Sequence, residues 1–140
     1  MVMLLPKTTT YRKMHRRDSK RTQKRCIKLE KGTFGLKSLT CSRLTSQQIE
    51  AARRTMHKRM NRIGFVSLRV FPDLSITAKP SEIRMGKGKG SISYWCYPIK
   101  IGEILFELHG ISRNTALEVC RLGTSKLPIQ TKFIIMKQKN

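Results

Sequence analysis

The sequence predicts an α+β fold: one small domain with a mixed or antiparallel sheet and two helices, preceded by an extended basic N-terminal arm. A chain of 140 residues suits a single domain. Helical and strand-like hydrophobic periods follow one another after residue 32, which is typical of one sheet with helices on a face. Residues 1–31 are dense in cations and lack the apolar side chains of a core. We therefore expect residues 1–31 to form the arm and residues 32–140 the domain.

The charge of the chain predicts a polyanionic partner. Thirty Lys and Arg residues against eight Asp and Glu residues give a formal net charge of +22. A net charge of about 2–8 is enough to keep a small domain soluble, so the excess indicates binding to a phosphate backbone. The longest apolar runs, such as Ile104–Phe106 and Phe133–Met136, are too short to span a bilayer. We expect a nucleic acid as partner and no membrane.

The first element is the arm. Eleven Lys or Arg residues lie between positions 7 and 31, and Val2–Leu5, Tyr11 and Met14 are the few apolar residues before Cys26. Such a segment becomes ordered when it meets phosphate, whereas a disordered tail without a partner is the alternative. The mixture of turn residues and apolar side chains at Gly32–Lys37 is where we expect the arm to dock.

A helix should follow, with Thr45 as its N-cap. Gln48 completes a capping box, and Leu44 and Ile49 form a hydrophobic staple. Gly64 is the expected residue after the C-cap. The apolar face comprises Ile49, Ala52, Met56, Met60 and Ile63. Cations, Arg53 and Arg54 among them, fill the remaining positions.

Three strands are expected next. Phe65–Phe71 alternates apolar and polar residues, and Ile76–Thr77 is a short extended piece. Ser91–Ile99 is a longer strand, in which Pro98 indicates an edge. After a turn at Ile101–Gly102, the chain should return at Glu103–Leu108 to complete a hairpin with Ser91–Ile99.

A second helix and a last strand complete the domain. Ser112 is the expected N-cap of a helix that runs to about Lys126, and Thr131–Met136 is the final strand. The residues expected to face the core from this helix are Ala116, Val119, Cys120, Gly123 and Leu127.

The most unusual segment is Gly86–Gly90, with the sequence Gly-Lys-Gly-Lys-Gly. Alternate glycines let the main chain approach another backbone closely, and Lys87 and Lys89 can neutralise phosphates. Lysine provides a point charge, so these contacts should position a nucleic acid without reading its sequence. A nucleotide-binding loop does not fit, because Ser91 stands where a dinucleotide motif needs glycine and a strand follows where a helix is required. A flexible loop without a partner is the other alternative.

Catalytic and metal-binding patterns are weak. The cysteines at 26, 41, 96 and 120 have no short spacing, so we expect free thiols, no metal and no cofactor. Glu103 and Glu107 should lie roughly 13 Å apart on one strand, too far for a glycosidase pair. We expect each to pair with a nearby Lys or Arg. The chain is therefore not expected to be an enzyme.

The motifs together resemble the bacterial-type large-subunit ribosomal protein L16 family, universally termed uL16. The match runs in order along nearly the whole chain. The segments that carry it are Leu5–Lys7, Tyr11–His15, Phe34–Lys37, Arg43–Thr45, Gln48–Arg54, Arg69–Asp73, Ile76–Thr77, Lys79–Pro80, Arg84–Gly90, Leu127–Ile129 and Thr131–Phe133.

The resemblance implies an α+β protein that structures large-subunit rRNA and helps to position aminoacyl-site tRNA, beside neighbouring ribosomal proteins and without a small-molecule substrate. A free-standing RNA-binding or chaperone protein is the alternative, and a small enzyme that uses the glycine loop is a third. The implied rRNA contacts are Lys7, Arg12, Lys13, His15, Arg16, Arg17, Arg53 and Arg54. The implied tRNA-facing loop comprises Arg84, Gly86, Lys87, Gly88, Lys89 and Gly90.

Several positions depart from the family pattern. Thr8 and Thr10 stand where the family tends to have Arg and Lys, Ser75 replaces a usual proline, and the four cysteines are atypical. Residues 18–31 are more basic and less glycine-rich than in bacterial members. Met3 aligns with the family's start, which leaves no room for an import sequence. Such drift favours a gene kept inside an organelle, so we expect a mitochondrial ribosome, then a plastid, then a bacterial cytoplasm.

Overall fold

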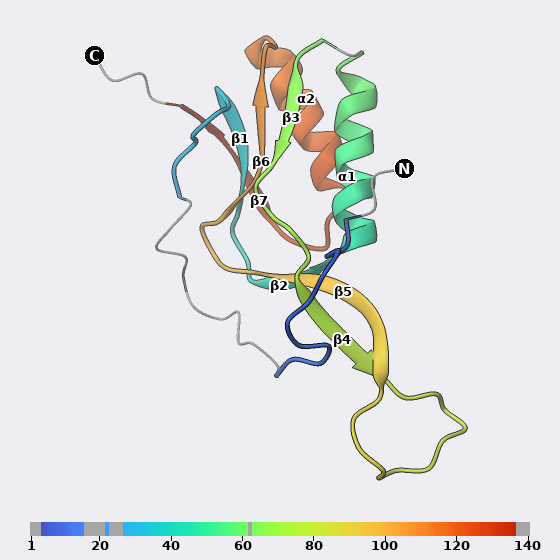
Figure 1. The fold of residues 1–140 in the computed structure, drawn as a ribbon. Helices are drawn as coiled ribbons and strands as arrows, with labels where there is room; N and C mark the ends of the chain where they lie inside the picture. The colour runs from blue at the N-terminus through green and yellow to red at the C-terminus, as the bar shows by residue number, and fades with distance from the viewer. Residues whose placement is uncertain (1–3, 16–21, 23–26, 62, 137–140) are drawn as a thin grey trace.

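The computed structural model describes residues 4–15, 22, 27–61 and 63–136, and within them it is an α+β domain with two helices and two antiparallel sheets. Helices α1 and α2 lie side by side and pack against the four-stranded sheet (Figure 1). The other sheet continues into a hairpin that projects away from the helices. The helices are α1 (Ser46–Arg59) and α2 (Arg113–Thr124). The strands are β1 (Phe34–Ser38), β2 (Ser42–Thr45), β3 (Phe65–Leu68), β4 (Leu74–Ala78), β5 (Ser91–Ile99), β6 (Ile104–His109) and β7 (Thr131–Ile135).

The expected single sheet is in fact two. One has the order β3-β6-β1-β7 and the other β2-β5-β4. The expected hairpin between Ser91–Ile99 and Glu103–Leu108 is therefore wrong, because β5 pairs with β2 and β4 whereas β6 pairs with β1 and β3. The physical reason lies in β6, which is buried from Ile104 to Leu108 as suits a central strand; β1 and β3 occupy both of its hydrogen-bonding edges and leave none for β5.

The connection from β5 to β6 carries the chain from one sheet to the other. Glu103 is buried there and accepts hydrogen bonds from the Tyr97 hydroxyl (2.5 Å) and the Lys100 backbone N–H (3.1 Å). Ser38 of β1 holds the same turn, since its hydroxyl donates to the Lys100 carbonyl at 2.6 Å. A buried carboxylate thus shapes a turn that the sequence predicted as the tip of a hairpin.

The segment expected to receive the arm is also a central strand. The Leu29 side chain of the arm lies against Gly35, within the expected docking segment Gly32–Lys37, and Phe34–Ser38 forms β1, which pairs with both β6 and β7. Gly35 is required at this crowded position, because a Cβ there would overlap the side chain of Leu29 and lie 3.1 Å from the Phe106 carbonyl oxygen. Pro98 also lies in a central strand, although in the part of β5 that pairs with β2 alone.

Helix α1 begins as predicted and ends differently. Thr45 and Gln48 form both hydrogen bonds of the capping box, and Ile49, Ala52 and Met56 are buried. The helix ends at Arg59 with Met60 as C-cap, so the following left-handed residue is Asn61 (φ 49°) and not Gly64. Because the helix stops there, Ile63 leaves the apolar face and is 66% exposed.

Helix α2 completes the core as the sequence predicted. Ser112 caps it, and Ala116, Val119, Cys120 and Gly123 are buried, as is Leu127 just beyond it. Gly123 faces Met56 of α1 so closely that a Cβ would overlap the end of that side chain and lie 2.9 Å from its Cγ. The two helices can therefore pack at short range. Among the described residues, neither helix is long and apolar enough to cross a membrane.

Candidate nucleic-acid interface

The connection between β4 and β5, residues 79–90, forms the outer end of the projecting hairpin (Figure 1). All its residues from 80 to 89 are exposed. Gly86, Lys87 and Gly88 have φ values of 96°, 53° and 86°, and nothing lies within 4 Å of a Cβ built on either glycine. Gly90 is different, because a Cβ there would overlap the backbone of Ala78 at the base of the hairpin. We call residues 84–90 the distal loop.

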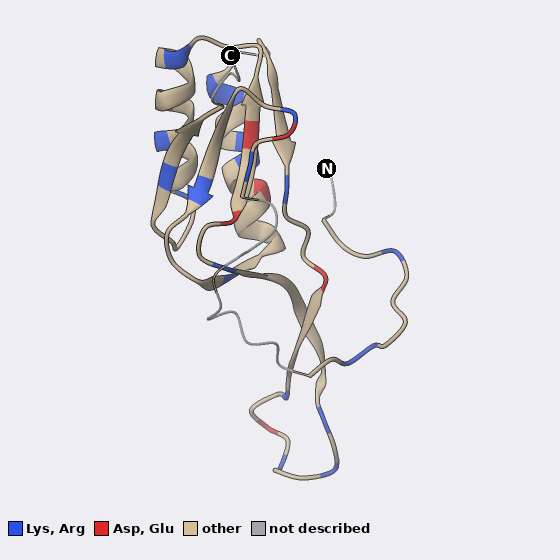
Figure 2. Ribbon diagram, turned by 90° about the vertical axis from the view of Figure 1, so that its left-hand side faces the viewer, with Lys and Arg blue, Asp and Glu red and all other residues tan. Residues whose placement is uncertain are grey.

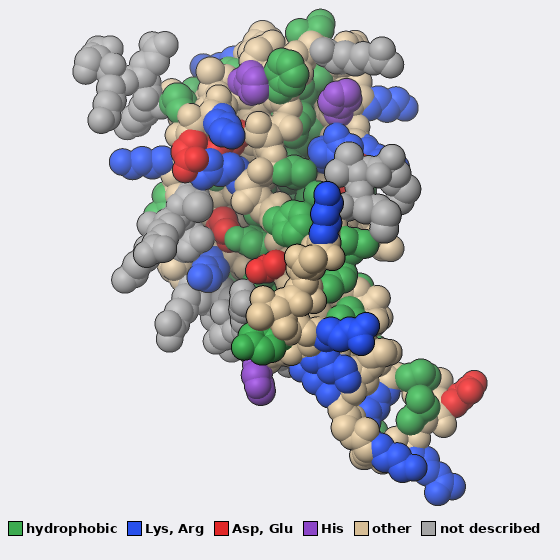
Figure 3. Space-filling view, in the orientation of Figure 1, with side chains coloured by type: hydrophobic (Ala, Val, Ile, Leu, Met, Phe, Trp, Pro, Cys, Tyr) green, Lys and Arg blue, Asp and Glu red, His purple; other side chains and the backbone are tan. Residues whose placement is uncertain are grey.

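Cations dominate this end of the molecule. Figure 2 shows Lys and Arg positions spaced along the projecting hairpin with few acidic positions near them, and Figure 3 shows their side chains on its surface. The Nζ of Lys79, just beyond the end of β4, donates a hydrogen bond to the Gly86 carbonyl and so stabilises the distal loop. Arg84 and Lys87 make no hydrogen bond or ion pair with any part of the chain that the structure describes. Their charges are available to a partner.

The arm lies against the base of the same loop. The Nζ of Lys13 donates to the Lys89 carbonyl, and the Nζ of Lys89 donates to the Met14 carbonyl, each at 2.6 Å. The Ser75 hydroxyl of β4 donates to the Arg12 carbonyl at 3.1 Å. Serine at position 75, where the resembled family tends to have proline, thus supplies an anchor for the arm. Further back, Leu4 is buried in the core cluster next to the helices.

The predicted arm residues therefore fall into two groups. Lys7, Arg12, Lys13 and His15 are exposed, and Arg12 to His15 run beside the distal loop. Arg16 and Arg17 lie outside the described residues. Together, Arg12, Lys13 and His15 with Arg84, Lys87 and Lys89 form what we call the arm–loop surface. The sequence predicted its members separately, and the contacts of Lys89 with Lys13 and Met14 join the arm to the loop.

The two predicted arginines of α1 are engaged within the helix. Arg53 donates two hydrogen bonds of 2.8 Å to the carboxylate of Glu50, and Arg54 donates one of 2.9 Å. The pKa of Glu50 falls to about 2, mainly because of the bonds from Arg53, with Arg54 adding to the effect. Glu50 is therefore ionised at neutral pH and holds both guanidinium groups in place. Arg54 is more than half exposed, so it remains accessible to a phosphate.

A buried carboxylate anchors the end of the arm. The sequence predicted its basic partner but not its hydrogen bonds to the backbone of the arm. Glu107 on β6 is fully buried and accepts hydrogen bonds from the backbone N–H groups of Lys31 (2.8 Å), Gly32 (2.9 Å) and Glu30 (3.3 Å). Its ion pair with Arg69 (3.4 Å) confirms the expected basic partner. Arg69 also binds Glu30, and those hydrogen bonds lower the pKa of the Glu30 carboxyl. The signal in the sequence that could have revealed this anchor was Glu107 itself, a single acidic residue inside an apolar strand.

The thiols do not form a reactive or metal-binding group among the residues that the structure covers. Cys41, Cys96 and Cys120 are free thiols there, and Cys26 lies outside the described residues. Burial raises the pKa of Cys96, and it raises that of Cys120 to about 12, so neither is a thiolate at neutral pH. In this part of the chain, no three His, Cys, Asp or Glu side chains are placed to hold a metal ion.

Comparison with known proteins decides the family. The family model described as ribosomal protein L16p/L10e matches residues 6–134, which include residues 6–31 of the arm and the whole distal loop. The chain belongs to the ribosomal protein L16p/L10e family. Two similar proteins are the large ribosomal subunit protein uL16 of Mesorhizobium japonicum, 48% identical, and that of Chelativorans sp., 49% identical. Each match spans 132 residues, 94% of this chain and 96% of the relative.

Membership in the L16p/L10e family confirms the resemblance and also the expectation that the chain is not an enzyme, because this is a family of structural ribosomal proteins. Both relatives come from bacteria, so the mitochondrial assignment stays a prediction. Residues 6–31 of the arm and the glycine-rich loop of this L16p/L10e protein both lie inside the matched region. They are therefore parts of the family's own pattern.

Proposed function

We propose that this structural constituent of the large ribosomal subunit binds large-subunit rRNA through its arm and α1, and presents its distal loop to aminoacyl-site tRNA. The observation that carries the proposal is the reciprocal pair of hydrogen bonds between Lys13 and Met14 of the arm and Lys89 of the loop. Because of it, the arm and loop form one cationic surface. Neighbouring large-subunit proteins are the other proposed partners.

The chemistry of the arm–loop surface suits a phosphate backbone. Lysine ammonium groups are compact point charges, and Gly86 and Gly88 carry no side chain that would keep a backbone away from the main chain there. Such contacts position an RNA without reading its sequence. The RNA would then perform the chemistry of translation while the protein holds its geometry. The other proposed rRNA contacts are Lys7 of the arm and Arg53 and Arg54 of α1.

Sedimentation tests the ribosomal assignment against a free-standing RNA chaperone. We expect the chain to co-sediment with large subunits at one copy per particle and to be released only at high salt, because counterions compete for the phosphates. A chaperone would instead bind many RNAs without fixed stoichiometry. Recovery of the chain only in the soluble pool would refute the proposal.

Replacing Lys87 and Lys89 with alanine should weaken tRNA binding more than subunit assembly. Loss of two phosphate contacts should make the plot of log K against log salt less steep, with the magnitude of its negative slope smaller by about 2. Lys87→Ala alone separates the effects, because Lys89 also holds Met14 of the arm. The measurement is filter binding of aminoacyl-site tRNA to reconstituted subunits at several salt concentrations. Lys132→Ala, an exposed lysine on β7, is the control. Blocked assembly with normal tRNA affinity would contradict the assignment of the loop.

The compartment is a separate proposal. The basic residues 18–31 and the atypical cysteines favour a mitochondrial ribosome, with a plastid as the second choice. The two bacterial relatives also fit a bacterial cytoplasm. Mass spectrometry of ribosomes from purified mitochondria should detect the chain, and its presence only in ribosomes of a bacterial culture would overturn the mitochondrial proposal.

A further inference from the structure

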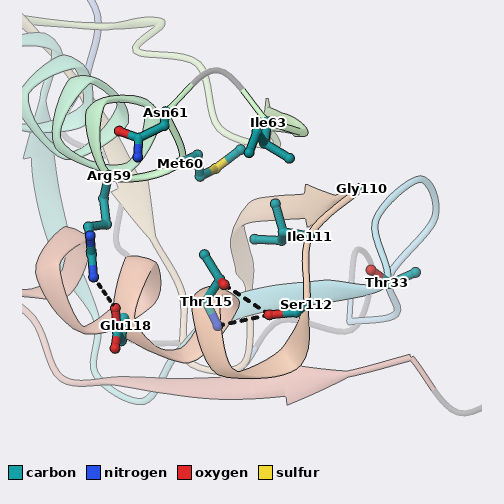
Figure 4. A pocket seen from close by; sticks show the side chains of 10 residues that line it. All are labelled: Thr33, Arg59, Met60, Asn61, Ile63, Gly110, Ile111, Ser112, Thr115 and Glu118. Carbon is teal, nitrogen blue, oxygen red and sulfur yellow. Dashed lines mark hydrogen bonds and ion pairs between the residues drawn. The ribbon is translucent and has the colours of Figure 1, made fainter.

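A groove lies between the end of α1 and the start of α2, far from the distal loop (Figures 1 and 4). Its volume is about 560 Å³, within the usual range for small-ligand sites. Met60, Ile63 and Ile111 provide an apolar lining. Asn61, Thr33, Ser112 and Thr115 add an amide and three hydroxyl groups. A ligand with a flat aromatic ring could therefore make apolar contacts with its faces and hydrogen bonds with the polar atoms at its edge.

An exposed aromatic side chain stands beside the groove. Phe65 opens β3 and is 67% exposed, and its ring stacks on the ring of His109 with centroids 5.0 Å apart and planes 20° from parallel. The two residues are direct partners across β3 and β6. An ordinary cross-strand pair would account for the inner face of Phe65. Because Phe65 is 67% exposed, this pairing leaves most of the side chain open to a further partner.

The stacked pair Phe65–His109 and the groove are connected by two chain segments that touch each other. Gly64 joins Ile63 of the groove to Phe65, and a Cβ on Gly64 would overlap the His109 carbonyl oxygen and lie 2.8 Å from the Ile111 side chain. The segments 63–65 and 109–111 are thus in direct contact. We call the groove together with Phe65 and His109 the Phe65 groove.

The surroundings of the Phe65 groove are cationic. His57, Lys58 and Arg59 occupy the last turn of α1, and Arg113 begins α2. All four are exposed. Glu118 contributes one acid to the lining, and Arg59 neutralises it through an ion pair of 2.6 Å. An apolar pocket with a cationic rim matches a nucleotide, which carries a flat base and a negative phosphate.

We propose that the Phe65 groove binds an unpaired nucleotide of ribosomal RNA, with the base stacked on the outer face of Phe65 and the phosphate near the cations of α1 and α2. The proposal rests on the proposed function and adds a contact that none of the predicted site residues provides. A neighbouring protein could cover apolar side chains as well. The cationic rim favours RNA over such a partner.

Ultraviolet crosslinking of native large subunits tests the contact directly. Trypsin cleavage at Arg62 and Arg69 releases residues 63–69, which contain Phe65, and cleavage at Lys7 and Arg12 releases residues 8–12 of the arm with Tyr11. We expect mass spectrometry to find a nucleotide on both peptides. A nucleotide on the arm peptide but not on 63–69 overturns the Phe65 inference alone. No nucleotide on any peptide of the chain overturns the proposed function as well.

Variants of Phe65 distinguish base stacking from apolar docking. Phe65→Ala and Phe65→Leu should each weaken binding of the full chain to large-subunit rRNA by about tenfold, whereas Phe65→Tyr should bind like the wild type. The exposed position of Phe65 lets each variant fold, and a thermal melt verifies this. Binding of Phe65→Leu at wild-type strength would mean that only apolar bulk matters, and this result would overturn the proposal.

Discussion

Replacement of Glu107 by alanine is expected to destabilise the protein by about 3–5 kcal/mol, the usual cost of breaking a buried ion pair. Glu107 is fully buried, and its loss would leave the buried Gly32 N–H without its acceptor. Urea unfolding of the free protein measures the loss. Hydrogen exchange should show faster exchange at the Lys31 and Gly32 amides, because both donate to this carboxylate.

Glu30→Ala is the matched control for Glu107→Ala. Both residues bind Arg69, but the Glu30 side chain is 62% exposed whereas that of Glu107 is fully buried. Exposed ion pairs contribute little to stability, so Glu30→Ala should leave the unfolding midpoint nearly unchanged. Equal losses for the two variants would show that Arg69, and not the buried backbone N–H groups, accounts for the effect.

Replacement of Gly64 by alanine is expected to cost about 3 kcal/mol, from two additive causes. Gly64 has a φ of 81°, a left-handed conformation that disfavours a side chain. Its Cβ would also overlap the His109 carbonyl oxygen in β6, and a backbone atom of a central strand cannot easily move away. Urea unfolding measures the cost, and the unchanged m-value expected of an otherwise native fold verifies the comparison.

Gly86→Ala separates the two causes, because Gly86 has a φ of 96° but no atom within 4 Å of a built Cβ. It carries the conformational cost without the overlap and lies in an exposed loop, so its loss should be about 1 kcal/mol or less. If Gly64→Ala were as mild as Gly86→Ala, the close contact between residues 63–65 and 109–111 would not exist in solution. The geometry of the Phe65 groove would then be wrong.

Local signals predicted the helices well because each helix carries its own boundary chemistry. The capping box of Thr45 and Gln48 and the cap at Ser112 are formed by residues three positions apart, so the sequence contains the whole interaction. The stop of α1 was harder to predict. Asn61 tolerates a left-handed conformation, so the helix ends before Gly64. Ile63 therefore leaves the expected core and joins the lining of the Phe65 groove.

Strand partners were predicted less well, because pairing depends on residues far apart in the sequence. The nearness of Ser91–Ile99 and Glu103–Leu108 suggested a hairpin, yet β6 pairs with β1 and β3 at its two edges. The turn residues in Gly32–Lys37 did not indicate a strand, although the missing side chain of Gly35 is what lets Leu29 and β6 approach β1. The same property of glycine produces turns and close strand packing, and only the neighbours distinguish them.

The sequence by itself determined the helices and the family and predicted a polyanionic partner, since charge, capping residues and ordered motifs are all local properties of the chain. The tertiary structure alone decided that the arm meets the distal loop through Lys13 and Lys89, whose contacts join residues 76 and 75 positions apart. It alone gave Glu107 three backbone donors and placed Phe65 beside a groove. These features arise from contacts between distant segments, which form only when the core packs.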